Sequence, residues 1–185
     1  SNAWRYINFS ISNQFYMMCL NEGLDFSKIR NLMRDKYERN LNIPKAGFTA
    51  GPCLLKDTMQ LSSYYKHKFP LCQSAVGINE KLPEFIIKKL SKKYNLRKKT
   101  IGILGLAFKA ENDDIRDSLS IKLLKLLKSK KIKTLQSDEF YKDKNNIPLK
   151  NLILKSDILI IGAPHKKYSK ITIPKNKKII NIWGI

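Results

Sequence analysis

The residues best suited to chemistry lie in one run, Gly47-Phe48-Thr49-Ala50-Gly51-Pro52-Cys53-Leu54-Leu55-Lys56-Asp57. Apolar residues at helical spacing follow Cys53 and predict a helix that begins at or near it. A thiol at a helix N-terminus meets free N–H groups and the positive end of the helix dipole, which favour the thiolate. Lys56 adds a cation, and Asp57 lies one turn along on the same face. We therefore expect a nucleophilic cysteine with a charged partner; the alternative is a small buried side chain at a helix start.

A second run further along the chain strengthens this interpretation. It reads Gly105-Leu106-Ala107-Phe108-Lys109, followed by Asp113-Asp114-Ile115-Arg116-Asp117-Ser118. The segment 51–58, Gly-Pro-Cys-Leu-Leu-Lys-Asp-Thr, resembles the active-site motif of the UDP-glucose/GDP-mannose dehydrogenase family. The second run is similar to that family's G-x-A-F-K and D-D-x-R-x-S motifs, in the same order and spacing. The resemblance covers essentially the whole chain from Trp4 onward.

The resemblance implies an NAD-dependent oxidoreductase that converts a UDP-hexose to a UDP-uronate for polysaccharide synthesis. The oxidation would run in two steps through a cysteine thiohemiacetal and a thioester, which suits a thiolate because it is both a good nucleophile and a competent leaving group. By this resemblance we expect catalysis from Cys53 and Asp57, substrate contacts from Phe48, Gly51, Phe108 and Lys109, and NAD contacts from Lys56 and Arg116.

Several features depart from the family pattern. The G-x-G-x-x-G turn of the family's N-terminal NAD-binding domain does not occur in this sequence, and the opening Ser1-Asn2-Ala3 resembles the remnant of an expression tag. We therefore expect a fragment that carries the central and C-terminal parts of the enzyme and is inactive by itself. The family's catalytic lysine would lie just upstream of Trp4, and its partner asparagine aligns with Asn2. Ala50 and Pro52 stand where many relatives have Gly and Ser, a difference compatible with a different sugar. The sugar (glucose, N-acetylmannosamine, N-acetylglucosamine or another) and the base stay open, because pocket shape across domains selects both.

Composition narrows the function further. The formal net charge of +21 favours anionic ligands, but the lysines are spread along the chain without a nucleic-acid-binding motif, so we expect no nucleic-acid partner. No apolar run approaches the roughly 20 residues of a membrane helix, and we expect a cytoplasmic protein. Three cysteines at unrelated spacings and two isolated histidines, His67 and His165, predict neither disulfides nor a metal site. Both histidines are expected at the surface.

The first half of the chain, residues 4–97, predicts an all-helical domain. We expect helices at 4–22, from Asp25 or Ser27 to about Asn40, from about Cys53 to Lys68, and at 71–95, with a kink or a restart at Pro83. In the first helix, Trp4, Ile7, Ile11, Phe15, Met18 and Cys19 repeat at helical spacing and are expected to face the core. The resemblance implies that this domain forms the core of a homodimer.

The second half, residues 98–185, alternates strand and helix patterns. Strands are predicted at 100–105, 133–137, 157–162 and 178–183, and helices at 120–131 and 149–155. This order indicates an α/β fold with a Rossmann-like parallel sheet, to which the resemblance adds UDP-sugar binding. Ligands of such sheets sit beyond the carboxyl ends of the strands, so the run from Phe108 to Ser118 is placed to meet one.

One alternative from a different class stays open. The chain could be a non-catalytic nucleotide-sugar-binding or regulatory module in which Cys53 is inert. The reactivity of the thiol separates the two interpretations, because a catalytic cysteine alkylates rapidly at neutral pH.

Overall fold

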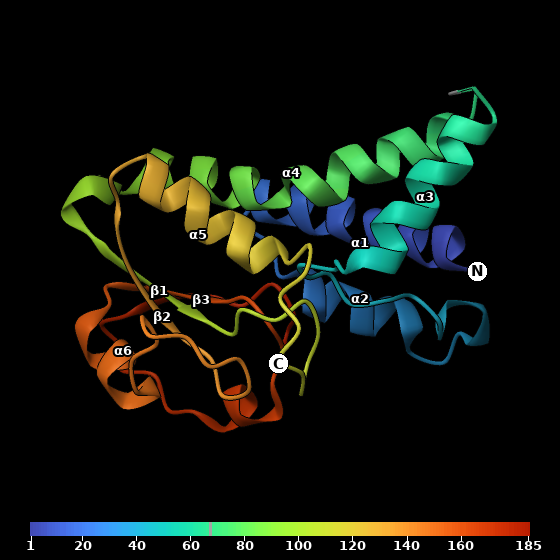
Figure 1. The fold of residues 1–185 in the computed structure, drawn as a ribbon. Helices are drawn as coiled ribbons and strands as arrows, with labels where there is room; N and C mark the ends of the chain where they lie inside the picture. The colour runs from blue at the N-terminus through green and yellow to red at the C-terminus, as the bar shows by residue number, and fades with distance from the viewer. Residues whose placement is uncertain (67) are drawn as a thin grey trace.

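The computed structural model describes residues 1–66 and 68–185, and combines a helical half with a four-stranded parallel sheet (Figure 1). The helical half contains α1 (Asn2–Asn21), α2 (Phe26–Arg34), α3 (Pro52–Tyr64) and α4 (Pro70–Lys93), with a short 3₁₀ helix, η1 (Glu38–Asn40). Helices α1, α3 and α4 pack against one another above the sheet. The predicted combination of a helical part with a parallel sheet is confirmed, whereas the division into domains at 4–97 and 98–185 stays a prediction.

Helix α1 presents the opposite face to the core from the one that its apolar pattern predicts. The side chains that it buries include Tyr6, Ser10, Ser12, Asn13 and Tyr16. Four of the apolar residues expected inside are exposed instead, namely Trp4, Ile11, Phe15 and Met18. The core expectation was wrong because small polar side chains on the buried face bond to neighbouring segments, which leaves an apolar stripe outside.

The ends of the other helices follow local signals with two differences. Asp25 caps α2 as expected by accepting from the backbone N–H groups of Ser27 and Lys28. However, α2 ends at Arg34 rather than near Asn40, and a turn and η1 follow. In α3 the buried side chains are Thr58 and Ser62, whereas Met59 is exposed. Helix α4 continues through Pro83 as a single assigned helix.

The sheet has strand order β2-β1-β3-β4, and all pairs are parallel. Its strands are β1 (Thr100–Leu104), β2 (Lys133–Ser137), β3 (Ile158–Ile161) and β4 (Lys178–Ile180), and its helices are α5 (Leu119–Ser129) and α6 (Leu149–Lys155). Short 3₁₀ helices, η2 (Leu96–Lys98) and η3 (Lys166–Lys170), complete the elements. The predicted α/β fold with a parallel sheet is confirmed, since each expected strand and helix forms within a few residues of its predicted bounds.

Two apolar layers cover the two faces of the sheet. Ile101, Ile103 and Ile160 pack with α5 on one face, whereas Leu104, Leu159 and Ile161 pack with Leu152 of α6 on the other. The first cluster extends without a break into the helical half, where it includes Tyr16, Phe48, Ala50, Leu82 and Ile86. Helix α5 lies between α4 and the sheet (Figure 1). The segment before Cys53 is therefore anchored in the same core as β1.

Among the residues that the structure describes, no helix combines the length and the apolar character needed to cross a bilayer.

Candidate functional site

Cys53 lies at the start of α3 and is open to solvent. Gly51 is the N-cap of this helix with φ 114°, and Pro52 fills the first helical position. Proline suits that position because its missing N–H would have no helical partner there. The Cys53 side chain is exposed, in contrast to buried Cys72. The predicted helix start and an accessible thiol are therefore both present.

Asp57 follows Cys53 by one helical turn and is held by the first residues of α1. The Nδ2 of Asn2 donates a hydrogen bond of 2.7 Å to Oδ2 of Asp57. A carboxylate fixed by one donor still has lone pairs free to accept from water. The family resemblance aligns Asn2 with the asparagine that partners the catalytic lysine. In this structure Asn2 binds Asp57, the carboxylate predicted to position water.

The two motif runs meet at Gly51 and Phe108. Phe108 belongs to residues 105–118, which follow β1 and are called the β1 loop below. A Cβ built on Gly51 would stand 2.8 Å from Cδ2 of the Phe108 ring, a separation that real side chains do not adopt. Only glycine allows this approach together with the positive φ. Lys109 is exposed beside the ring, with its Nζ 5.7 Å from the ring centroid.

Arg116, on the same β1 loop, is bound to Asp114 and lies near the thiol. Its Nη2 donates to Oδ2 of Asp114 at 2.6 Å, and its Nε donates to both carboxylate oxygens. Hydrogen bonding to Asp114 raises the pKa of Arg116, with a smaller electrostatic contribution from Cys53. The guanidinium side chain is 74% exposed, so part of its fork stays available to an anionic ligand.

Lys56 faces a shallow groove along α3. The groove holds about 520 Å³, and its lining comprises Leu55, Lys56, Met59, Gln60, Ser63, Tyr64 and Asp117. Asp117 comes from the β1 loop, so this groove also joins the two motif runs. The expected NAD-contacting residues Lys56 and Arg116 thus lie on neighbouring segments, α3 and the β1 loop, and Cys53 precedes Lys56 on the same helix.

Phe48 contributes to the site through its backbone segment. Its side chain is 1% exposed and packs in the core, so the ring does not face solvent. The expected contact of Phe48 with substrate stays a prediction. The ring instead anchors the thiol loop, defined here as residues 41–51. The position of this loop is therefore set by burial of Phe48 and Ala50.

Buried polar residues of α1 and α4 hold the thiol loop from behind. The backbone N–H of Gly47 donates to Oδ1 of Asn13 at 2.9 Å, and Asn13 donates to Oδ1 of Asn79 at 2.8 Å. Ser12 donates to the carbonyl of Pro44, and Arg30 donates to the same carbonyl. Burial lowers the pKa of Arg30. Ser12 and Asn13 were not predicted from the sequence, because they lie on the face of α1 opposite its apolar stripe, where polar side chains are the ordinary expectation for a solvated face.

His165 corrects a further expectation, because it is 0% exposed rather than at the surface. Its Nε2 lies 3.4 Å from Oδ2 of Asp138, and its Nδ1 accepts from the backbone N–H of Glu111 at 2.9 Å. Asp138 also accepts from the N–H groups of Leu106 and Ala107. Neither residue was singled out from the sequence as functional. His67 lies outside the described residues.

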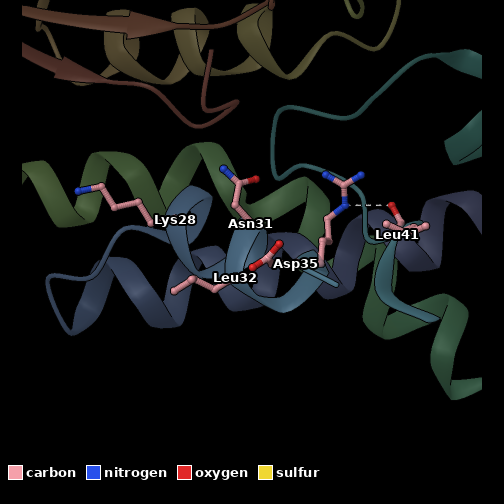
Figure 2. A pocket seen from close by; sticks show the side chains of 6 residues that line it. Lys28, Asn31, Leu32, Asp35 and Leu41 are labelled. Atoms are coloured by element: carbon pink, nitrogen blue, oxygen red, sulfur yellow. Dashed lines mark hydrogen bonds between the residues drawn. The ribbon is translucent and has the colours of Figure 1, made fainter. Parts of the chain in front are cut away.

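A second hollow lies away from the predicted site, on α2 and the turn that follows it (Figure 2). It holds about 670 Å³ and is lined by Lys28, Asn31, Leu32, Arg34, Asp35 and Leu41. The Nε of Arg34 donates to the carbonyl of Leu41 at 3.0 Å and fixes the turn. None of the predicted site residues lines this hollow.

Two family models match the chain over most of its length. Residues 1–81 match the central domain of the UDP-glucose/GDP-mannose dehydrogenase family, and residues 102–183 match its UDP-binding domain. The second match starts within β1 and includes the β1 loop, and the first includes Cys53 and Asp57.

Curated relatives and solved structures agree with these matches. The chain is 25% identical over 175 residues to UDP-N-acetyl-D-mannosamine dehydrogenase of Pyrococcus horikoshii, covering 92% of this chain and 41% of that protein. It is 26% identical over 217 residues to GDP-mannose 6-dehydrogenase of Azotobacter vinelandii, covering 99% of this chain and 48% of that protein. A UDP-glucose dehydrogenase structure from Pyrobaculum islandicum superposes with a TM-score of 0.85 at 21% identity, covering 99% of this chain and 46% of that one.

The chain therefore spans less than half the length of these relatives. Its homologues are nucleotide-sugar dehydrogenases, its two halves match two successive domains of one family, and the fold agrees with that of a solved member. On this evidence the chain is a member of the UDP-glucose/GDP-mannose dehydrogenase family of oxidoreductases.

Proposed function

We propose that this chain forms the central and UDP-binding parts of an NAD-dependent nucleotide-sugar 6-dehydrogenase, with Cys53 as the nucleophile. The observation that supports this most is the meeting of the two motif runs at one place. The exposed thiol begins α3, and Gly51 next to it packs against Phe108 of the β1 loop. The β1 loop starts at the carboxyl end of a parallel strand, where ligands of such sheets bind.

The oxidation divides into steps that these residues can perform. The 6-hydroxyl of the sugar first loses a hydride and a proton and becomes an aldehyde. The thiolate of Cys53 then adds to the aldehyde carbon, which forms a C–S bond, and the carbonyl oxygen takes up a proton to give a thiohemiacetal. Loss of a second hydride from the carbon and of the hydroxyl proton gives a thioester. Asp57, oriented by Asn2, positions a water molecule whose attack on the carbonyl releases the carboxylate and the Cys53 thiolate.

NAD is the expected hydride acceptor, and two exposed cations of the chain fit its pyrophosphate. Arg116 keeps most of its guanidinium in solvent, and Lys56 lines the groove on α3. Planar guanidinium donors suit phosphate oxygens. When bound, NAD takes up one hydride in each oxidation. Because the sequence has no G-x-G-x-x-G turn, these residues would contact NAD that another domain presents, and the chain alone would not oxidise the sugar.

Phe108 and Lys109 are the proposed contacts for the nucleotide sugar. The ring offers an apolar face, and the ammonium 5.7 Å from its centroid offers a charge for phosphate. A UDP-hexose is the proposed substrate because the C-terminal half matches the UDP-binding domain of the family. The product uronate would serve polysaccharide synthesis. The free thiols at Cys19, Cys53 and Cys72 fit a reducing cytoplasm.

We further propose that the apolar stripe on α1 packs against a second copy of the chain. Trp4 is 70% exposed, and Ile11, Phe15 and Met18 follow it along the same helix. Contiguous exposed apolar residues of this size on a soluble protein commonly mark an interaction surface. A second copy would bury them against an identical stripe through a two-fold axis.

The thiohemiacetal step needs no NAD, so it can be tested with this chain as it stands. We expect a UDP-hexose oxidised to the 6-aldehyde to protect Cys53 from iodoacetamide, because the thiolate adds to the aldehyde. The corresponding UDP-hexose with a 6-hydroxyl, at the same occupancy by calorimetry, should protect it far less. Mass spectrometry of the Cys53 peptide reports the alkylated fraction.

Two controls make the outcome decisive. Cys53→Ser should bind the aldehyde and the alcohol equally, because only the thiol distinguishes them. Equal protection of wild-type Cys53 by both sugars would instead favour the non-catalytic module. Binding of GDP sugars without UDP sugars would contradict the proposed substrate class.

A further inference from the structure

A buried polar cluster contacts the β1 loop. Its centre is His165, which follows β3 and precedes η3. The imidazole has no exposed surface, and it lies close to the rings of Phe140 and Tyr168, with centroid separations of 4.9 and 5.3 Å. Close packing holds a fully buried histidine in one orientation, so its two nitrogens point at defined partners.

The hydrogen bonds of His165 determine its tautomer. Its Nδ1 lies 2.9 Å from the backbone nitrogen of Glu111, which can only donate, so Nδ1 accepts. The proton of the imidazole ring is therefore on Nε2, which donates to Oδ2 of Asp138 across 3.4 Å. Asp138 thereby fixes the tautomer in which Nδ1 accepts from the β1 loop, as carboxylates fix the tautomer of metal-binding histidines.

The same two residues hold the β1 loop at both ends of its substrate-facing part. Asp138 accepts from the N–H groups of Leu106 and Ala107, just before Phe108 and Lys109. His165 accepts from Glu111, just after them. The two residues proposed to contact the nucleotide sugar are thus the ones between the two anchor points.

Glu111 has a conformation that needs such support. Its φ is 53°, in the left-handed region that residues with a Cβ seldom adopt. Besides the bond to His165, its carboxylate Oε1 accepts from the backbone N–H of Lys166 at 3.0 Å. The pair of bonds runs in both directions between the β1 loop and the segment after β3.

We propose that His165 is a positioning residue, which through its bond to Glu111 holds Phe108 and Lys109 in place opposite Cys53. The inference rests on the proposed function for the identity of the ligand, but not for the geometry. Asp138 acts through His165 and through the loop amides, and neither side chain touches the substrate. Without the bond to Glu111, the β1 loop would lose the anchor that follows Lys109.

Two variants of similar size separate the two bonds of His165. His165→Asn can keep an oxygen acceptor near the Nδ1 position and so can retain the bond to Glu111. His165→Gln can keep a nitrogen donor near the Nε2 position and so can retain the bond to Asp138. We expect the asparagine variant to behave like wild type within about threefold, and the glutamine variant to bind UDP-hexose about tenfold more weakly, which corresponds to one lost hydrogen bond.

A readout without ligand keeps this test separate from the proposed function. In NMR spectra, the nuclear Overhauser contact between the Phe108 ring and the α-protons of Gly51 should persist in the asparagine variant and weaken in the glutamine variant. Exchange of the Glu111 amide should accelerate only in the glutamine variant. If these NMR and amide-exchange results are obtained but neither wild type nor either variant binds UDP-hexose, the positioning role of His165 is retained and UDP-hexose is refuted as the ligand.

The opposite results would overturn the proposal. If both variants lose UDP-hexose affinity and the Phe108–Gly51 contact equally, the bond to Glu111 does not determine the position of the β1 loop. If neither variant loses them, the β1 loop keeps its position without His165. If both variants fail to fold, wild-type amide exchange decides. The Glu111 amide, on an exposed residue, must then exchange far more slowly than that of neighbouring exposed Asp113, and equal rates would refute the anchor.

Discussion

Phe108 lies against Gly51 so closely that a Cβ on the glycine would stand 2.8 Å from the ring. We expect Gly51→Ala to destabilise the fold by about 2 kcal/mol or more, since it combines a backbone conformation disfavoured for alanine with a clash. It should also move Phe108 and weaken UDP-hexose binding. Urea unfolding and calorimetry measure the two effects.

Gly23→Ala is the matched control for this prediction. Gly23 also has positive φ, 73°, but a Cβ there meets nothing within 4 Å. Gly23→Ala should therefore lower the free energy of unfolding only by the cost of positive φ for alanine, about 1 kcal/mol, and leave UDP-hexose binding unchanged. If both variants lose stability equally and both bind normally, the contact with Phe108 has no role in shaping the site.

The three thiols should react in a fixed order. Cys53 is exposed, whereas burial raises the pKa of both Cys19 and Cys72 and so lowers their thiolate fraction at neutral pH. We expect iodoacetamide at pH 7.5 to modify Cys53 first and Cys72 last, and the order should disappear in urea. Peptide mass spectrometry over time reports each rate. A Cys53 that reacts more slowly folded than unfolded would argue for the inert module.

Asp138 should contribute to the loss of stability in acid. Burial raises the pKa of its carboxyl, but hydrogen bonds from His165 and from the amides of Leu106, Tyr141 and Phe140 together lower it to about 2. The stabilisation from ionised Asp138 is fully present at pH values above 3.8, the pKa of the unfolded state, and is lost as the pH falls through about 2. The shift corresponds to about 2 kcal/mol of unfolding free energy.

This effect can be isolated by substitution. Asp138→Asn should be less stable than wild type at pH 6, and the difference should narrow by about 2 kcal/mol as the pH falls to 2. Asp113→Asn removes one exposed carboxylate from the β1 loop and controls for the change in net charge. A constant difference at all pH values would show that Asp138 does not carry this pH dependence.

The apolar stripe on α1 predicts a dimer that one charge can disrupt. Phe15→Asp places a carboxylate in the proposed interface, and we expect it to raise the dimer dissociation constant about thirtyfold or more, the effect of an interface hot spot. Leu32→Asp is the control, because Leu32 is 74% exposed on α2. Sedimentation equilibrium gives both constants. A monomeric wild type, or equal effects of the two variants, contradicts the dimer.

The elements of the sheet were predictable because each carries a strong local signal. The buried strand at Ile158–Ile161 is a continuous apolar run, and Ser118 caps α5 as its position before an amphipathic stretch suggests. The start of α3 beside Cys53 was predictable from Gly51 and Pro52, which directly precede the cysteine. Local signals of this kind do not depend on the rest of the fold.

The orientation of α1 and the state of His165 were not predictable from local pattern. Apolar spacing marks one face of α1, but buried hydrogen bonds from Ser12 and Asn13 to distant partners turn that face outward. His165 is buried because Asp138 and Glu111, from other segments, satisfy both of its nitrogens. Partners far away in sequence decide both cases, so a pattern of neighbours does not contain them.

The contact of Gly47 with Trp183 implies an order of events while the protein is being made. A Cβ on Gly47 would overlap the indole of Trp183, so the ring forms one wall of the segment that leads to Cys53. On the ribosome, the first half of the chain emerges long before that indole is synthesised. The nascent helices can pair early, yet the sulfur acquires its final surroundings only after translation has reached Trp183.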